Sequence, residues 1–230
     1  MEDTLPKNNM EYNYKKGDIW LNLGCGVSLA DDFINVDNFF DLKDLKKGQK
    51  TKKGAYCNAR VTKDTKFVRA DICALPFPDN YADYVECSDV IEHQPIAHVA
   101  QALSEMYRVL KPGCKLGLST TNFDALAKLW TINVTNNPLK TQNDWAKFIT
   151  LSQVIYGNQA GPGEFHKSAF NPYTMGYYLQ SVGFKLENIV IKIFPTNSPC
   201  DLQQKAYKHV DVKWSDTVVL TEMMWIEATK

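Results

Sequence analysis

The sequence has no apolar stretch long enough to cross a membrane, because its longest hydrophobic runs fall far short of the roughly 20 residues that a spanning helix needs. It also has no excess of either charge, since 26 lysines and arginines balance 26 aspartates and glutamates among 230 residues. This balance excludes an overall electrostatic footprint for nucleic acid or an anionic membrane. Residues 1–17 are polar and lack the apolar core of a secretory signal, so we expect a flexible lead-in.

Cys-x-x-Cys pairs are also lacking. The six cysteines are widely spaced, which argues against a disulfide framework and a zinc site, and we predict no metal. Several of them lie in or beside apolar strand-like runs, where a free cysteine behaves as a small hydrophobe. This use of cysteine favours a reducing, cytoplasmic location. The six positions are Cys25, Cys57, Cys73, Cys87, Cys114 and Cys200.

The composition is that of a globular protein, with 44% hydrophobic and 23% charged residues. We expect one domain over residues 18–230. Strand-like and helix-like segments alternate, which predicts an α/β, Rossmann-like fold with a mostly parallel seven-stranded sheet and an antiparallel last strand. Helices are expected at about 96–110 and 172–184, and strands at 18–23, 33–37, 66–71, 82–88, 115–120, 187–194 and 217–228.

Two segments do not fit the alternation. Residues 121–170 hold aromatic, helix-like pieces between the fifth strand and the next helix, where an α/β enzyme would place a cap over its substrate. We expect this insertion to be a substrate cap. Residues 41–65 contain a lysine-rich run at 43–53 that could grip phosphates, although most such runs are simply solvated.

The first strand-like run ends in a Gly-x-Gly turn, Gly24-Cys25-Gly26. Glycine permits a sharp turn and a close approach of a ligand to the backbone, so the turn suggests a nucleotide-type ligand, although an ordinary tight turn explains it equally well. The dinucleotide fingerprint needs a third glycine three residues later, where this chain has Leu29. A nicotinamide dehydrogenase is therefore disfavoured.

Acidic residues end the next two strands. Asp37 ends the second strand, where a carboxylate beside a glycine turn can accept both ribose hydroxyls of a nucleoside, and Asp71 ends the third. A lone strand-end aspartate would be read as solvated. Three successive strands that end in a glycine turn and two acids, all at the ligand-binding edge of an α/β sheet, point to a nucleoside ligand.

Four separated motifs in this order resemble a class I S-adenosylmethionine-dependent methyltransferase. They are "LNLGCG", "NVD", "ADICALPFPDNYADYVECSDVIEH" and "EMYRVLKPGCKLGLST", within residues 18–120. The resemblance implies S-adenosylmethionine as cofactor and methyl transfer as the activity. It implies that the backbone at Gly24, Cys25 and Gly26 faces the methionyl part of the cofactor.

The same resemblance assigns the rest of the cofactor site. Asp37 would hold the ribose hydroxyls, Asp71 would accept the adenine amino group, and the Ile72 amide would contact a ring nitrogen. Ser88 would lie under the methionine moiety. Beyond it, Asp89, Glu92 and His93 would open toward the substrate.

The chain departs from the family in two ways. Many members carry an acid two residues before the first glycine, whereas this chain has Asn22, so we expect a weaker or water-mediated contact with the cofactor there. Only 13 residues separate Leu23 from Asp37, which leaves room for a single turn in place of a full first crossover helix. The insertion or the lead-in would then cover the sheet near the first strand.

Methyl transfer needs orientation and, for some acceptors, a base, and no nucleophilic serine or cysteine. His93 is the first candidate base, because it follows the fourth strand and titrates near neutrality, with loop ordering as its structural alternative. His166 is the second, with an exposed loop histidine as its alternative. The five-residue spacing of His93 and His98 does not match a metal motif.

The leading hypothesis is therefore methyl transfer to a small-molecule or sugar-like acceptor. A nucleic-acid or protein acceptor is the first alternative, supported only by the lysine-rich run. A non-catalytic module that binds S-adenosylmethionine or S-adenosylhomocysteine is the second, because fold alone does not fix function.

Overall fold

The computed structural model describes residues 17–30, 32–40, 42–43, 61–136, 140–159, 161, 163–197 and 220–230. Apart from Gly17, the expected lead-in lies outside these residues, as does the lysine-rich run apart from Lys43. No helix in the described part of the chain is both long enough and apolar enough to span a bilayer.

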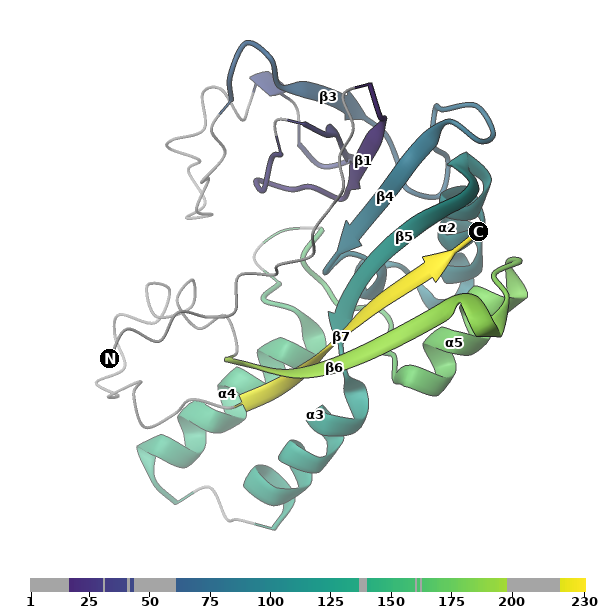
Figure 1. Ribbon diagram of the computed structural model, residues 1–230. Coiled ribbons are helices and arrows are strands. Elements are labelled where there is room, and N and C mark those ends of the chain that lie inside the picture. Colours follow the sequence, from purple (N-terminus) through teal and green to yellow (C-terminus); the bar gives the residue numbers. More distant parts are fainter. Residues whose placement is uncertain are drawn as a thin grey trace, which may run out of the picture.

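Seven strands form one sheet in the order β3-β2-β1-β4-β5-β7-β6 (Figure 1). Strands β1 to β5 pair in parallel, and β7 runs antiparallel to both β5 and β6. This arrangement confirms the predicted mostly parallel sheet with an antiparallel last strand. The strands are β1 Trp20–Leu23, β2 Ile34–Asp37, β3 Lys66–Arg69, β4 Ala82–Ser88, β5 Leu110–Thr121, β6 Ile189–Asn197 and β7 Leu220–Thr229.

Helices α2 and α5 lie side by side on one face of the sheet (Figure 1). Apolar residues at helical spacing bury one stripe of α2, as its sequence predicts. This stripe packs with α5 and with the inward-facing strand residues in one core. The helices are α2 Ile96–Val109, α3 Phe123–Trp130, α4 Gln142–Tyr156 and α5 Pro172–Ser181, with short turns η2 Ile91–His93, η3 Thr131–Thr135 and η4 Leu186–Asn188.

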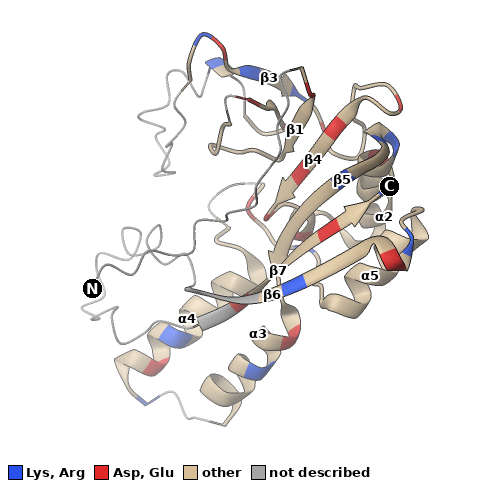
Figure 2. Ribbon diagram, viewed as in Figure 1, with Lys and Arg blue, Asp and Glu red and all other residues tan. Residues whose placement is uncertain are grey.

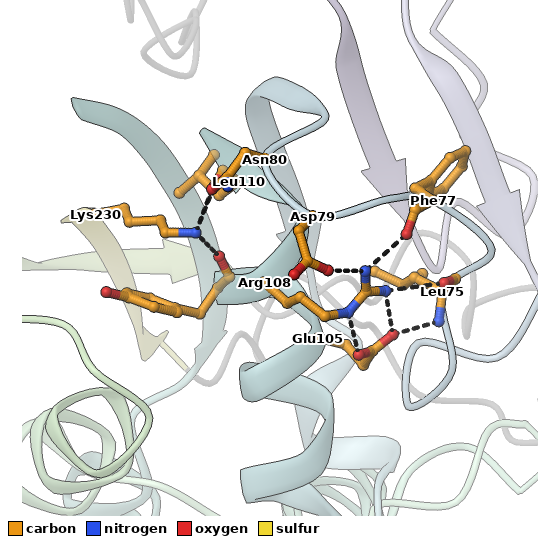
Figure 3. A network of polar contacts seen from close by, with 9 residues as sticks. Leu75, Phe77, Asp79, Asn80, Glu105, Arg108, Leu110 and Lys230 are labelled. Atoms are coloured by element: carbon orange, nitrogen blue, oxygen red, sulfur yellow. Dashed lines mark hydrogen bonds and ion pairs between the residues drawn. The ribbon is translucent and has the colours of Figure 1, made fainter. Parts of the chain in front are cut away.

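Two cationic side chains tie the end of α2 to its surroundings (Figure 3). Arg108 donates to Glu105 and Asp79 and to the carbonyls of Leu75 and Phe77, at 2.7–3.1 Å. Lys230 donates to the carbonyls of Tyr107 and Leu110 and to Asn80, each at 2.8 Å. Such contacts satisfy carbonyls that the end of a helix leaves without partners. Arg108 thereby holds the loop between β3 and β4 against α2.

A hydrogen-bonded turn takes the place of the first crossover helix. The Ser28 N–H donates to the Cys25 carbonyl at 2.7 Å, and the described residues between β1 and β2 contain no helix. The buried side chain of Asn35 fixes this segment: its Oδ1 accepts from Asn22 and from Ala30 N–H, and its Nδ2 donates to the carbonyls of Ala30 and Lys66. The hydrogen bonds of this one side-chain amide thus hold the short crossover in place without a helix.

Aromatic side chains cover the sheet beside this crossover. Trp20 lies 5.2 Å, centroid to centroid, from both Phe33 and Tyr84. A Cβ at Gly117 would lie 2.1 Å from the Tyr84 hydroxyl and 2.8 Å from the Trp225 ring. Strand β5 therefore has a glycine where these two side chains pack against it. Among the described residues, the aromatic side chains that cover the sheet near β1 therefore come from the strands and from the crossover.

The insertion at 121–170 forms α3, η3 and α4 at the carboxyl end of β5 (Figure 1). Its two ends meet, because the Phe123 N–H donates to the Phe170 carbonyl at 2.8 Å. Leu126 and Leu151 form the centre of a small core of its own. The insertion is thus a helical unit beside the carboxyl edge of the sheet, which is the edge where open α/β folds bind ligands.

Candidate functional site

The two glycines of the first loop are required for different reasons. Both have positive φ angles, +63° at Gly24 and +50° at Gly26, which other residues rarely adopt. A Cβ at Gly24 would lie 2.4 Å from a Val90 methyl, so packing within the protein excludes a side chain. A Cβ at Gly26 would meet nothing within 4 Å. Gly26 thus borders open space where a ligand can approach the backbone.

Asp37 is oriented by three backbone N–H groups. Its Oδ2 accepts from Gly26 at 2.9 Å, and its Oδ1 accepts from Phe39 at 2.7 Å and Phe40 at 3.1 Å. The side chain is only 6% exposed. A carboxylate offers about four lone-pair sites and three are used here, so this anchored group can still accept one further hydrogen bond. The glycine turn and the end of β2 therefore form one unit.

Asn22 and Cys25 stabilise the glycine loop by hydrogen bonds inside the protein. The Asn22 Nδ2 donates to the Ser28 carbonyl at 2.9 Å and to Asn35 at 3.0 Å, so this amide braces the loop. The Cys25 N–H donates to the Val36 carbonyl. Burial raises the pKa of the Cys25 thiol to about 12, which makes this cysteine an inert packing group. Both residues support the glycine turn.

Asp71 and Ile72 follow β3 at the same edge of the sheet. The Asp71 Oδ1 accepts from the Cys73 N–H at 2.8 Å, and its Oδ2 accepts from Asn38 at 3.5 Å, while the carboxylate remains exposed. Ile72 is buried, and no hydrogen bond in the described part of the chain uses its N–H. An acceptor and a donor are thus available side by side.

The end of β4 leads from this region toward the insertion. The Ser88 hydroxyl donates to Glu86 at 3.2 Å, and Asp89, with a φ of +55°, accepts from the Ser119 hydroxyl at 3.2 Å. The turn η2 follows, and the carbonyl of Glu92 accepts from the N–H groups of Lys167 and Ser168. These bonds fasten the end of β4 to the loop after the insertion.

The two candidate bases lie against each other. The rings of His93 and His166 are 4.8 Å apart in an edge-to-face arrangement. His93 Nδ1 donates to the Phe165 carbonyl at 3.1 Å, and His166 Nδ1 donates to the Val154 carbonyl at 2.9 Å. Burial lowers the pKa of both rings, that of His166 to about 4. Both imidazoles are therefore neutral near pH 7, with the lone pair on Nε2.

A cavity of about 20 Å³ lies between the carboxyl edge of the sheet and the insertion. This volume accommodates about one water-sized group. Its walls combine polar groups from η2, β5 and the loop after α4 with apolar groups from α3 and α4. The lining residues are Glu92, Thr120, Thr121, Phe123, Leu126, Val154, Ile155, His166, Ser168 and Ala169. His166 lines this cavity, whereas His93 contacts it only through His166.

The burial of Glu92 is a feature of the site that the sequence did not predict. Glu92 is 4% exposed, and its Oε2 is buried with no hydrogen-bond partner. Burial, followed by the nearby charge of Asp89, raises the pKa of the Glu92 carboxyl to about 8. The sequence placed Glu92 beside His93 after the fourth strand, but its burial depends on a loop more than 70 residues away.

The residues at this edge fit S-adenosylmethionine. Asp37 presents an anchored carboxylate, Gly26 borders open space, and Asp71 with Ile72 offers one acceptor and one donor. A nucleoside requires these groups: a carboxylate for the ribose, and a paired acceptor and donor for the edge of the adenine ring. Asn22 braces the glycine loop through the Ser28 carbonyl, and Ser88 hydrogen-bonds Glu86 within β4.

Comparisons with known proteins agree with this geometry. Residues 21–118, from β1 into β5, match a family described as a methyltransferase domain. A crystal structure of an S-adenosylmethionine-dependent methyltransferase from Methanosarcina mazei superposes with a TM-score of 0.55 at 15% identity, covering 94% of each chain. The chain thus shares the fold of these methyltransferases, and residues 21–118 are similar to the methyltransferase-domain family.

Two relatives are similar in sequence over shorter stretches. The ubiquinone/menaquinone biosynthesis C-methyltransferase of Stutzerimonas stutzeri is 43% identical over 56 residues, which are 24% of this chain and 21% of that protein. An uncharacterized protein of Methanocaldococcus jannaschii is 32% identical over 123 residues, which are 51% of this chain and 47% of that protein. The chain thus spans less than half the length of these relatives.

Proposed function

We propose that this protein is an S-adenosylmethionine-dependent methyltransferase that acts on a small-molecule acceptor bound between the cofactor edge of the sheet and the insertion. The observation that carries the proposal is Asp37, held by three backbone N–H groups beside the open approach to Gly26. A carboxylate fixed in this way is pre-organised to accept a hydrogen bond from the ribose of a nucleoside. Asp71 and Ile72 would hold the adenine, and Asn22, Gly24, Cys25 and Ser88 would shape the methionine end.

The chemistry places modest demands on the chain. S-adenosylmethionine supplies a methyl group on a sulfonium, so the protein has to align an acceptor with it and exclude water. The insertion is placed to do both, which supports its role as a substrate cap. Where the acceptor must lose a proton, His166 is the better-placed base, because it lines the cavity and its Nε2 is unprotonated near neutral pH. His93 would then orient His166.

Two observations favour a small acceptor. Acidic and basic side chains are interspersed over the described elements, without a continuous basic band among them (Figure 2). The relative from Stutzerimonas stutzeri is also named for the biosynthesis of ubiquinone and menaquinone, which are not macromolecules. Free thiols at the four described cysteines support the proposed reducing, cytoplasmic location.

Calorimetric titration with S-adenosylmethionine, S-adenosylhomocysteine and NAD in parallel tests the cofactor. Binding of the first two and not of NAD is expected. Asp37→Ala should weaken cofactor binding by about 1–3 kcal/mol, because the ribose hydroxyls lose their acceptor. Asp64→Ala, an exposed acid before β3, is the matched control and should bind normally. Equal affinity of the wild type and Asp37→Ala would refute the ribose assignment.

Turnover separates an enzyme from a binding module. A screen of small acceptors with methyl-labelled cofactor should give a methylated product, and His166→Gln should slow its formation while the cofactor affinity stays within about twofold. Tight cofactor binding without any product across the screen would favour the non-catalytic alternative.

A further inference from the structure

Glu92 is a buried acid that the protein leaves half satisfied. Thr120 hydrogen-bonds its carboxyl group, yet its Oε2 is buried without a partner. Leaving a buried polar atom without a hydrogen bond typically costs about 1–3 kcal/mol, so native structures rarely keep one without a use. The unpartnered atom belongs to a residue that lines the cavity under the insertion. The carboxyl group thus has an unused bonding position at a space that can hold a ligand group.

The backbone of Glu92 is held in place by the loop after α4. Ser168 and Lys167 donate backbone N–H groups to the Glu92 carbonyl at 3.1 and 2.8 Å, and the Ser168 hydroxyl donates to the Ile91 carbonyl at 3.3 Å. The turn η2 is therefore locked to the loop that follows the insertion. These bonds fix the backbone from which the Glu92 side chain projects.

A second residue that lines the cavity offers complementary chemistry. His166 Nδ1 donates to the Val154 carbonyl, so its Nε2 carries the lone pair of a neutral ring. Glu92, with a pKa of about 8, holds its proton near neutral pH. The cavity therefore combines one donor, the Glu92 carboxylic acid, with one acceptor, the His166 ring nitrogen, between apolar walls from α3 and α4.

We propose that the cavity lined by Glu92 and His166 is a subsite for a single neutral hydroxyl group of the methyl acceptor, with Glu92 donating a hydrogen bond to the hydroxyl oxygen and His166 accepting a hydrogen bond from the hydroxyl O–H. The inference rests on the proposed methyltransferase function and narrows its substrate class. The acceptor is then a largely apolar alcohol or phenol. Its hydroxyl enters the cavity, whose volume of about 20 Å³ admits a group of that size.

Other ligand groups match this pair less well. An ammonium has no lone pair to accept the Glu92 proton, and a carboxylate or phosphate has no proton to give His166. Either ion would also lose its hydration against the apolar walls without a full set of partners. A hydroxyl both accepts and donates, so it satisfies both walls at once. A trapped water could do the same, and the experiment must separate the two.

Four ring probes of similar size test the subsite directly. Phenol, anisole, benzylamine and benzoate are titrated by ligand-observed NMR into the full chain at neutral pH. Phenol should bind at least about tenfold more tightly than anisole, in which a methyl group replaces the hydroxyl proton, so that it can accept but not donate a hydrogen bond. Benzylamine and benzoate should bind no better than anisole. In Glu92→Met the preference for phenol should disappear.

Glu164 provides a matched control. Its Oε2 is also buried without a partner, yet it does not line the cavity. Glu164→Gln should therefore keep the preference for phenol. Glu92→Gln, a conservative change that retains a donor, should keep part of it, and it preserves the test should Glu92→Met not fold.

Infrared spectroscopy gives a second readout. A protonated carboxylic acid has a carbonyl band of its own, which should be present at neutral pH in the wild type and in Glu164→Gln and absent in Glu92→Gln. Phenol should shift this band, and anisole should not. Equal binding of phenol and anisole, a preference for benzylamine, or a band that no probe moves would show that the cavity holds water only and would overturn the proposal.

The two proposals fail separately. Cofactor titration tests the methyltransferase function without an acceptor, and the phenol-to-anisole ratio tests the subsite without a cofactor. Loss of cofactor binding with an intact phenol preference would refute the function alone. Normal cofactor binding without that preference would refute the subsite alone.

Discussion

At the scale of single residues, the two glycines of the first loop show how one motif can meet two separate demands. Gly24 makes room for Val90, and Gly26 leaves the backbone open on its outer side. From the sequence motif alone, both glycines would be interpreted as making room for a ligand. Only the contact of Gly24 with a residue 66 positions later distinguishes them.

Alanine at these two positions should therefore have different effects. Gly24→Ala should destabilise the fold by more than the about 1–2 kcal/mol of its left-handed backbone, because its methyl also meets Val90. Adding Val90→Ala should recover part of the loss. Urea unfolding of the three variants measures this coupling. Additive losses would show that the contact with Val90 is unimportant.

Gly26→Ala should cost only the backbone strain, since its methyl meets nothing in the protein. Its main effect should appear in calorimetry as weaker binding of S-adenosylmethionine. Unchanged cofactor affinity would mean that the open side of Gly26 faces solvent alone.

Asn35 is the residue on which the short crossover most depends. Replacing it with Leu should cost about 2–4 kcal/mol of unfolding free energy, because several buried backbone groups lose their partner at once. Asn38→Leu, at an exposed position three residues later, is the control and should be nearly neutral. Thermal and urea unfolding would check both, and equal stabilities would contradict the role assigned to Asn35.

At the scale of elements, the loop between β3 and β4 depends on a helix for its position. This loop begins with Asp71 and Ile72, and Arg108 of α2 binds its carbonyls at Leu75 and Phe77. Hydrogen bonds from Arg108 also lower the pKa of Glu105, whose carboxylate accepts from the Leu75 N–H. The Arg108 guanidinium and the Glu105 carboxylate thus hold the loop that carries the proposed adenine-binding residues.

Arg108→Met should lower the unfolding free energy by about 2 kcal/mol and loosen the loop. Arg108→Lys should recover little, because an ammonium cannot reproduce the planar fork of donors. Hydrogen exchange should rise selectively over residues 71–81. Uniform exchange across the chain in Arg108→Met would show instead that the network holds no particular loop.

Much of the element order could be read from the sequence, because its alternation and turn residues report local preferences. The stripe of α2, the ends of β4 and the antiparallel last strand all follow from such patterns. The state of Glu92 and His166 could not, since it depends on a loop folding back across more than 70 residues. The same applies to Asn35, whose partners include the Lys66 carbonyl of β3.

At the scale of the whole molecule, the buried acid and the buried imidazole give stability an opposite dependence on pH. The pKa of Glu92 is about 8 in the folded protein and about 4.5 as its ordinary value. The folded state therefore retains a proton that the unfolded chain releases. Its contribution is full below about pH 4.5 and is lost as the pH rises toward 8.

Wild-type unfolding free energy should accordingly fall relative to Glu92→Gln between about pH 5 and pH 8. His166, with a pKa of about 4 against an ordinary 6.5, acts in the other direction, so stability is lost as the pH falls from 6.5 toward 4. His166→Gln should remove that loss. Urea titrations at four pH values would check both signs. Parallel pH profiles for the wild type and Glu92→Gln would contradict the first.

The position of β7 has a consequence for how the protein is made. It is the last of the seven strands along the chain, yet it lies between β5 and β6. While a ribosome builds the chain, β5 therefore exposes one unpaired edge, and β6 has no neighbour in the sheet until residues 220–229 have emerged. Open edges of this kind invite wrong partners. The nascent protein is thus at risk of aggregation for as long as residues 220–229 have not been made.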